Sequence, residues 1–487
     1  MFRSNERGMA LVVAMFMTLI VSALAASMTF VARTETLSSQ SYTTMAQARY
    51  AAESGLAAAA NYLLSSQYGD QAPDTPADSF GNYDTLMSPV RTGGQIVELS
   101  TEGGSNYPIS TVVQQFTNAA KGSLTVSNGT VQYGARARLL GMRPVSNTIT
   151  GTAQLLQTWE ITGTGSRTGS GSAEVEVRAI IERQMVPMFR YGAFAADPGC
   201  AALTLSGGAT SRSYNSSQLQ NGNPVPADTG GDVGTNGNLN ISGNPTKVYG
   251  TLSTPRTGVG SCTTSNVTAM TVQGKAEVYG GLVELPQEVP YPMPPAPDPM
   301  PPTTNVQINN SFSCSDPRCS RSGDVVTLSP ASGVPYVLGN VSVNSMELVL
   351  GAGTYIVNSL DVAGTSTIRP AGNGPVIINV AGQGSGSTAI SIAGGALSNE
   401  TYIPANFQIL YAGTKSVSIS GGTQTSALVY TPKADVTLTG NSNFYGAVVG
   451  AQVDIPGSTS LYFDTALQAE FSAAGNPVMS SFTWRTF

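Results

Sequence analysis

The sequence predicts an α+β fold that is mostly β, with a long N-terminal helix, a small antiparallel sheet and a C-terminal β-solenoid. Three observations lead to this prediction. An uncharged run from Met9 to Ala32 continues into a helical pattern of small residues. Alternating apolar and polar residues follow between about residues 130 and 185. Short apolar pairs before a glycine then recur through the C-terminal half.

The composition is typical of an uncharged, β-rich surface protein. The 487 residues suffice for about three domains. Hydrophobic residues make up 41% and can build packed cores, whereas charged residues make up only 11%. The net charge is −6 and the basic residues are scattered, so we expect no nucleic-acid partner. The absence of histidine excludes Ser-His-Asp and Cys-His catalysis and His-ligated metals, so we expect no enzyme, no metal and no other cofactor.

The N-terminal segment is long and apolar enough to span a membrane. Its 24 residues from Met9 to Ala32 carry no charge. A helix of that length spans about 36 Å, more than the roughly 30 Å of a hydrocarbon core. Arg3 and Arg7 flank the run on its N-terminal side, which predicts a cytoplasmic N-terminus and an exported remainder.

Three processing routes fit this N-terminus. A secretory signal peptide would have Leu11–Val21 as its apolar core and would be cut after Ala25. An uncleaved anchor is the second route. The third is a basic leader, residues 1–8, cut between Gly8 and Met9 so that the apolar helix is kept.

Helical spacing beyond Ala32 favours the third route. Small and apolar residues there step by three and four, as on one helix face: Met45, Ala48, Ala52, Leu56, Ala59 and Leu63. We therefore expect one helix over residues 9–66, with residues 9–32 in the membrane. A cleaved signal peptide would have no use for that continuity.

Two stretches carry a resemblance to a known family. Arg7-Gly8-Met9-Ala10-Leu11-Val12-Val13, followed by Ala48-Arg49-Tyr50-Ala51-Ala52-Glu53-Ser54-Gly55-Leu56, resembles the N-terminal region of PilX-type minor pilins. The similarity to GspK-type pseudopilins of type II secretion is looser. The resemblance covers about 60 residues. It implies that a prepilin peptidase cuts after Gly8 and methylates the new amine of Met9.

The same resemblance implies the role, partners and location of the chain. Most pilins carry glutamate at the fifth mature position, which here is Val13, and a missing acid suits a subunit at the tip or in the priming complex. The implied partners are other pilins, the pilus assembly platform and the bacterial inner membrane. The implied location is that membrane before assembly, then the pilus. The alternatives are a secreted or membrane-anchored β-helix surface protein and a polysaccharide-active enzyme.

Residues 67–195 are expected to form a pilin-like α+β head. Residues 67–110 resemble loops, and Ser110–Ala120 a short helix. Three strands are predicted at Thr130–Leu140, Gln154–Thr162 and Ala173–Met185, with a hairpin loop from Gly163 to Gly171. The acids of the last strand are expected to lie on a solvated strand face rather than in a catalytic site: Glu174, Glu176 and Glu182.

The C-terminal repeats predict stacked strands in two parts, residues 196–284 and 336–487. Eight segments share an apolar pair before a glycine or near it, and they start at Leu203, Leu239, Met270, Leu360, Ile390, Val417, Val436 and Val453. Three of them lead to a Tyr-Gly ending, at Tyr249, Tyr279 and Tyr445. A repeat of about 17–20 residues favours a β-solenoid over an irregular β-sandwich. This half also resembles, more weakly, the β-helical extensions of some large PilX-like proteins.

Residues 285–335 are expected to be a proline-rich linker followed by a cysteine loop. Nine of the 18 residues from Leu285 to Pro302 are proline, which predicts an extended spacer. The four cysteines allow three pairings. Cys314 and Cys319 could close a small loop, which would leave Cys200 to pair with Cys262. We expect disulfides rather than zinc, because the spacing does not supply paired ligands around all four cysteines.

Two further groups of residues have side chains that could bind a ligand. Oxygens of Asp228, Asp232, Asn236 and Asn238 suit calcium, but their spacing matches no known loop, so no metal site is predicted. The repeated tyrosines could stack on carbohydrate at a cell surface. We expect them instead to pack between coils.

Overall fold

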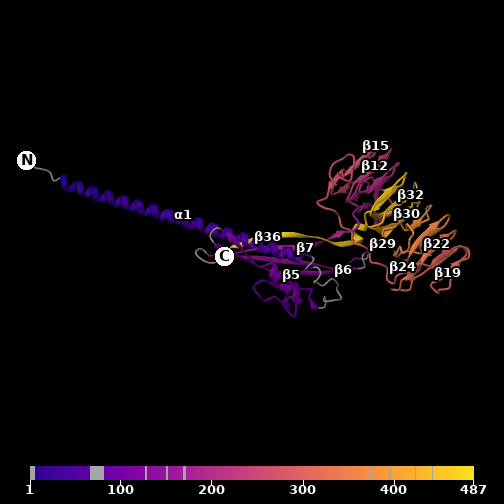
Figure 1. Ribbon diagram of the computed structural model, residues 1–487, viewed down its shortest axis with the longest axis horizontal. Helices are drawn as coiled ribbons and strands as arrows, with labels where there is room; N and C mark the ends of the chain where they lie inside the picture. Colours follow the sequence, from indigo (N-terminus) through magenta and orange to yellow (C-terminus); the bar gives the residue numbers. More distant parts are fainter. Residues whose placement is uncertain are drawn as a thin grey trace, which may run out of the picture. The chain divides into compact units, whose positions relative to one another are not determined.

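The computed structural model describes residues 6–65, 68, 82–126, 129–147, 149, 152–167, 172–372, 374–393, 396–422, 424–440 and 442–486. The chain forms two compact units. Unit 1 comprises Met1–Ser146, Ala153–Met185 and Ala474–Phe487, and unit 2 comprises Asn147–Thr152 and Val186–Ala473. The protein is mostly β, with one long N-terminal helix and several sheets (Figure 1).

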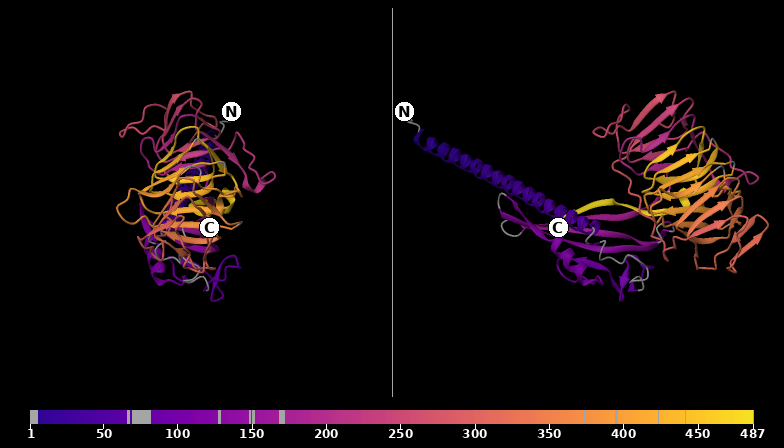
Figure 2. Two further views of the ribbon diagram at one scale, coloured as in Figure 1. Left: turned by 90° about the vertical axis from the view of Figure 1, so that its right-hand side faces the viewer. Right: turned by 45° about the vertical axis from the view of Figure 1, so that its right-hand side comes forward.

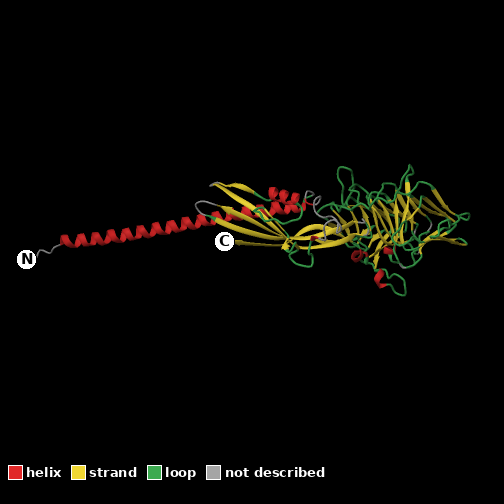
Figure 3. Cartoon of the chain, turned by 90° about the horizontal axis from the view of Figure 1, so that it is seen from below, coloured by secondary structure: helices red, strands yellow, loops and turns green. Residues whose placement is uncertain are grey.

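The long helix is α1, which runs from Glu6 to Leu64 over 59 residues. It begins three residues before the expected start at Met9 and ends at Leu64, two residues short of the expected 66. The face expected from the sequence is buried at Ala48, Ala52, Leu56, Ala59 and Leu63, whereas Met45 is only half-buried. Figure 3 shows this C-terminal half of the helix lying along the strands of unit 1.

Unit 1 contains a six-stranded sheet in the order β3-β5-β6-β7-β36, and β4 pairs with residues 129–133 of β5. Its pairs β3/β5, β4/β5 and β6/β7 are antiparallel. The elements are β3 (Glu98–Ser100), α4 (Ser110–Ala119), β4 (Gly122–Val126), β5 (Gly129–Asn147), β6 (Thr152–Arg167), β7 (Ala173–Pro187) and β36 (Ser472–Thr486). A two-stranded hairpin, β1 (Arg91–Thr92) and β2 (Gln95–Ile96), lies in the stretch expected to be irregular. The predicted helix and three strands are therefore present.

One expectation for this sheet is wrong. The segment from Gly163 to Gly171 was expected to be a hairpin loop because it is rich in Gly, Ser and Thr. Instead β6 continues to Arg167, and Gly163 pairs with Val177 across the sheet. The rest of that loop, residues 168–171, lies outside the described residues.

Unit 2 is an insertion between two neighbouring strands of unit 1. Strand β7 ends at Pro187, β36 begins at Ser472, and the two are hydrogen-bonded neighbours in the sheet. The chain therefore leaves the sheet, builds all of unit 2 except Asn147–Thr152 and returns to the adjacent position (Figure 1).

Ten parallel strands in unit 2 form one sheet that contains all eight sequence repeats. Its order is β15-β12-β9-β34-β32-β30-β28-β25-β22-β18. The strands are β9 (Leu203–Leu205), β12 (Leu239–Gly243), β15 (Met270–Gly274), β18 (Asn305–Ile308), β22 (Asn340–Asn344), β25 (Ser359–Ala363), β28 (Thr388–Ile392), β30 (Ser416–Ser420), β32 (Val436–Thr439) and β34 (Val453–Ile455). Equivalent repeat positions are in register, as at Leu203↔Leu239 and Val417↔Val436.

A second sheet of 14 parallel strands follows the same progression. Its main path is β16 (Glu277–Val278), β13 (Lys247–Val248), β10 (Thr210–Tyr214), β35 (Ser460–Asp464), β33 (Asn443–Gly450), β31 (Ser426–Thr431), β29 (Phe407–Tyr411), β27 (Val376–Val380), β24 (Gly353–Val357) and β21 (Tyr336–Val337). A branch from β33 continues through β8 (Ala193–Ala195), β11 (Val233–Thr235), β14 (Leu252–Thr254) and β17 (Leu282–Glu284). A smaller sheet contains β19 (Cys319–Ser322), β20 (Val325–Leu328), β23 (Glu347–Leu350) and β26 (Thr367–Pro370).

The strand order shows that the early and late repeats meet in the middle of the stack. Strand β9 lies between β12 and β34, and β10 lies between β13 and β35. Register partners at this junction are Leu203↔Val453 and Thr210↔Ser460. In Figure 2 the yellow C-terminal strands accordingly lie between purple early strands and orange later ones. A continuous core of apolar side chains runs through the stack, including Leu239, Ile241 and Val436.

Candidate functional site

The first half of α1 is an apolar surface that the described part of the chain leaves bare. Met9, Phe16 and Phe30 are 71%, 65% and 73% exposed. Among the described residues, α1 is one helix that is long and apolar enough to cross a membrane, and its most apolar window has no buried residue. An uncovered apolar surface of this size is unfavourable in water. It must therefore be covered by lipid or by other apolar helices.

Threonine hydroxyls in this half of α1 bond backbone carbonyls about one turn earlier in the helix. The hydroxyl of Thr18 donates to the Met15 carbonyl at 2.9 Å, and that of Thr29 donates to the Ala25 carbonyl at 2.7 Å. Thr34 makes the same bond to Phe30 at 2.9 Å. Because these hydroxyls are satisfied within the helix, they need no water in a hydrocarbon layer.

The residues expected to be processed lie at the beginning of this surface. Gly8 and Met9 are both in the first turns of α1. Val13 is 53% exposed and presents a methyl surface where most pilins present a carboxylate. The next charged side chains along the helix are Arg33 and Glu35, beyond the uncharged run.

The second half of α1 lies on the sheet of unit 1 with almost no space between the two backbones. A Cβ on Gly165 would overlap the Ala48 carbonyl oxygen, and one on Gly163 would overlap that of Ala52. On the helix side, Gly55 is similarly close to the carbonyl of Gly134 in β5. Sequence reasoning placed the strand glycines in a loop. Their spacing of two, opposite a helix face of alanines, is the signal that could have placed them under α1.

An aromatic cluster fixes the end of α1 to α4 and the sheet. The Tyr62 hydroxyl donates to the Val112 carbonyl at 3.3 Å, and the Tyr62 ring meets Phe116 edge-to-face at 5.9 Å. Burial raises the pKa of Tyr62 to about 12. Tyr68 contacts Trp159 with ring centroids 6.3 Å apart. These contacts therefore hold the C-terminal end of α1 against α4 and the sheet.

Acidic residues on this sheet pair with arginines. Glu98 bonds Arg138 at 2.8 Å, and Glu176 lies 3.2 Å from Arg178 and 3.8 Å from Arg136. Glu174 is exposed, as the strand-face expectation implied, whereas Glu176 and Glu182 are both half-buried. Each paired carboxylate is held by a cation, which suits structure rather than proton transfer.

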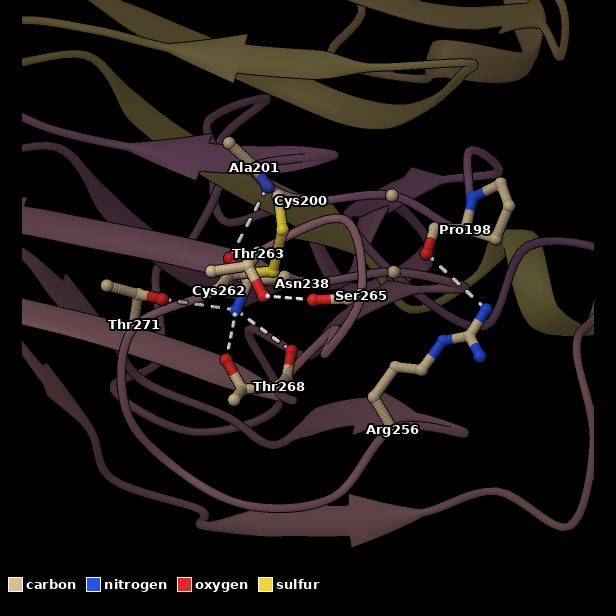
Figure 4. Close-up of a disulfide and its surroundings, with 12 residues drawn as sticks. Pro198, Cys200, Ala201, Asn238, Arg256, Cys262, Thr263, Ser265, Thr268 and Thr271 are labelled. Atoms are coloured by element: carbon tan, nitrogen blue, oxygen red, sulfur yellow. Dashed lines mark hydrogen bonds between the residues drawn. A yellow bond between two sulfur atoms is a disulfide. The ribbon is translucent and has the colours of Figure 1, made fainter.

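Two disulfides lie in unit 2. Cys200 is bonded to Cys262, and Cys314 is bonded to Cys319. The first ties the loop before β15 back to the start of β9 (Figure 4). Beside it, the Asn238 side chain donates to the Thr268 carbonyl at 2.9 Å and lies 3.3 Å from the Thr271 hydroxyl. The three early repeats, which start at Leu203, Leu239 and Met270, are therefore joined at this point.

The oxygens considered for calcium are engaged in protein bonds. Asp228 pairs with Arg212 at 3.1 Å, and Asp232 accepts from the Thr251 amide at 2.7 Å. The Asn236 side chain accepts from the Val289 amide at 2.8 Å and donates to the Val289 carbonyl at 3.0 Å. Asn238 belongs to the disulfide region. The structure does not bring the four together as one ligand set.

The repeated tyrosines pack between successive strands. Tyr445 stacks on Tyr462 at 4.8 Å, and Tyr249 stacks on Tyr279 at 5.1 Å. The guanidinium of Arg212 lies 4.8 Å from the centre of the Tyr249 ring. Arg212 is also the register partner of Tyr462 on the neighbouring strand, so it lies between the two tyrosine pairs. The stacked faces of these tyrosine rings therefore contact one another or Arg212, as expected from the sequence. Those faces are not free to stack on a sugar. Tyr279, the last ring, is 54% exposed.

The proline-rich segment is bound along unit 2. Glu288 pairs with Arg256 at 2.7 Å, and the Tyr430 hydroxyl donates to the Pro292 carbonyl at 2.6 Å. Tyr291 contacts Phe194 with ring centroids 4.7 Å apart. Farther along, the Gln383 amide donates to the Pro301 carbonyl at 2.9 Å. We call residues 285–304 the strap, because they connect β17 at one end of the stack with β18 at the other.

Comparisons with known proteins give limited matches. A family model described as a domain of unknown function (DUF7305) matches residues 303–470, which cover the later repeats from β18 to β35. No match is found among curated proteins. Among solved structures, the chain is similar to the crystal structure of the competence-associated pilin ComZ from Thermus thermophilus, at 13% identity with 91% of this chain and 98% of that chain covered. The TM-score of 0.22 establishes no common fold.

Proposed function

We propose that this protein is a minor-pilin-like subunit of a type IV pilus or a related filament. The observation that carries the proposal is the division of α1. One half is a bare apolar rod, and the other is buried against an antiparallel sheet of its own unit. A subunit built in this way can leave its rod in the membrane or insert it among the rods of other subunits without disturbing its own fold.

We propose further that residues 1–8 are a leader cut between Gly8 and Met9. The new N-terminus would then begin the uncharged surface of α1 directly. Val13 offers no carboxylate to neutralise the amine of a neighbouring subunit, which supports a position at the tip or in the priming complex. Before assembly the chain would cross the inner membrane once, with its N-terminus in the cytoplasm.

Unit 2 is proposed to be a β-solenoid that projects from the filament for contact with surfaces. Its parallel ladders and in-register repeats support this interpretation, because each turn of chain places equivalent residues above one another. The proposed division of the chain is 67–195 for the head, 196–284 and 336–487 for the two repeat parts, and 285–335 for the linker between them. The role is structural and adhesive rather than catalytic.

The N-terminus of the mature protein tests the proposal. Sequencing and intact mass should give a methylated Met9 as the first residue. A start at Ala26 would indicate a cleaved signal peptide, and an intact leader would indicate a plain anchor. Either result contradicts the filament role.

Two variants strengthen this test. Gly8→Arg should block processing and keep the chain out of sheared filaments. Ala25→Leu removes the alternative cleavage motif while keeping the rod apolar, so it should be processed at Met9 and assembled normally. A filament fraction that lacks the wild-type protein would also contradict the proposal.

A further inference from the structure

The two ends of the strand stack in unit 2 differ. At the β18 end, β19 adds an antiparallel strand beyond β20, and Phe312 and the disulfide-bonded Cys319 pack against the core. Ile308, Val326 and Leu328 at this end are at most 1% exposed. This end is capped, as stacked strands require if their apolar interior is to stay dry.

The other end has no such cap. Strands β15, β16 and β17 are each the last of their rows among the described strands. Leu252 in β14 is fully buried, but its register partner Leu282 in β17 is 41% exposed. Ile241 in β12 is likewise buried, whereas its partner Val272 in β15 is 39% exposed. Side chains at these positions are therefore buried in β12 and β14 but exposed at the equivalent positions of β15 and β17.

The stack stops here because of the residues that follow. After Glu284 the chain does not add another turn but enters the strap, beginning Leu285-Pro286. Proline has no amide hydrogen and cannot extend a strand ladder. The outer backbone groups of β15, β16 and β17 are thus left as strand edges within a continuous chain.

Partial cover comes from the loop held by Cys262. Val259 forms a parallel bridge to Met270, and the Gly260 amide donates to the Met270 carbonyl at 2.9 Å. That loop reaches only the beginning of β15. Val283, in β17, is 42% exposed, and Tyr279 has Tyr249 on one side only. We call β15, β16, Tyr279 and β17 the open end.

We propose that the open end docks against the open end of a second copy of this chain. Three strand edges, each the end of its own row, border one core, so a single added strand would cover one edge and leave the others bare. A partner that covers all three edges at once needs three strand edges in the same arrangement, which the open end of another copy has. The capped end cannot supply it, because Phe312 and Cys319 pack against the core there.

Charge and symmetry agree with a second copy. The open end carries Lys275 together with Glu277 and Glu284, so both signs are present and like charges need not meet. The same patch on both partners defines a two-fold contact, in which strands cross the junction antiparallel. Since the opposite end is capped, the association closes as a dimer and does not grow into a fibre.

Light scattering on the full chain in detergent tests this inference. The wild-type protein should have the mass of two chains at micromolar concentration. Val283→Lys should halve that mass, because it places a charge on the exposed edge strand β17, beside the core-facing Leu282. Val225→Lys is the matched control: Val225 is 44% exposed in the same unit but away from the open end, and its mass should stay that of two chains.

Two results would overturn the inference: a wild-type chain that is monomeric at every concentration, or a dimer that persists in Val283→Lys. If that variant folds poorly by circular dichroism, Leu282→Gln provides a milder substitution with the same expected result. Association through α1 would be unaffected by either change. The inference is independent of cleavage at Gly8, so its failure would leave the proposed filament role standing.

Discussion

Gly165 of β6 lies directly beneath the carbonyl oxygen of Ala48 in α1, so close that a Cβ on the glycine would overlap that oxygen. The two residues are far apart in sequence, yet they set the depth at which the helix lies on the sheet. The contact leaves no room for a side chain on this part of β6. It therefore explains why a strand under a helix carries glycines at alternate positions.

Gly165→Ala should destabilise unit 1 by about 1–3 kcal/mol, the usual cost of overpacking. Gly141→Ala is the matched control, because a Cβ there would meet Thr158 at an ordinary 3.8 Å. Both tryptophans of the chain, Trp159 and Trp484, belong to unit 1, so their fluorescence during denaturant unfolding reports on it. Equal stability of the two variants would contradict the close packing.

Ile20→Lys should weaken retention in the membrane. Ile20 is 56% exposed in the middle of the uncharged run, where a lysine costs roughly 2.5–3.5 kcal/mol. Tyr42→Lys is the control, since Tyr42 is 74% exposed but lies beyond that run. The measurement is the share of protein in washed membranes. The idea fails if both variants fractionate alike.

Tyr291→Ala should loosen the strap from unit 2. The change removes the ring contacts with Phe194 and Tyr430, and large-to-small substitutions of this kind cost up to several kcal/mol. Cleavage after Glu288 by a glutamyl endopeptidase should become about tenfold faster. Met300→Ala, at a site that is 57% exposed, should leave the rate unchanged. An unaltered rate in Tyr291→Ala would show that the strap is held elsewhere.

Asp464→Asn should remove a pH dependence from the stability of unit 2. Asp464 is 1% exposed, and burial raises the pKa of its carboxyl group. Hydrogen bonds that Ser216 and Ala466 donate to this carboxylate oppose the rise. The folded state therefore keeps this proton at a pH where the unfolded chain has lost it. Stability falls as pH rises from the ordinary value of 3.8 through the raised pKa, and it stays lower above that pKa.

Thermal midpoints measured from about pH 4 to about pH 7 check this sign. The wild type should lose stability relative to Asp464→Asn as the pH rises, because asparagine keeps an acceptor oxygen without the charge. Glu470, whose pKa is also raised by burial, remains in both proteins. A constant difference across the range would exclude Asp464 as the cause.

Local patterns in the sequence predicted the elements but not how distant elements meet. The spacing of Ala48, Ala52 and Leu56 marked the buried face of α1, because helical periodicity is a local property. The apolar pairs marked eight strands of one sheet for the same reason. Strand β22 lacks the glycine signal and was missed. Gly163 was assigned to a loop because composition says nothing of a helix packed above it.

The junction between early and late repeats could not be predicted. Leu203 pairs with Val453. The repeats share the same apolar pattern, so the sequence does not indicate which repeat lies beside which. The route of the strap decides which end of the stack the chain reaches next, and proline-rich sequence fixes only that the route is extended. The processing residues Gly8 and Met9 were singled out by the end of the basic leader against the apolar run and by the helical spacing beyond Ala32, and they stay predictions.

The position of β36 has a consequence for the order of folding during synthesis. Strands β3 to β7 can assemble on α1 once they emerge, but the outer edge of β7 waits until the entire insertion has been made. Premature termination anywhere within unit 2 therefore leaves that edge unpaired and prone to aggregation. Completion of the first sheet thus reports that the whole polypeptide has been translated.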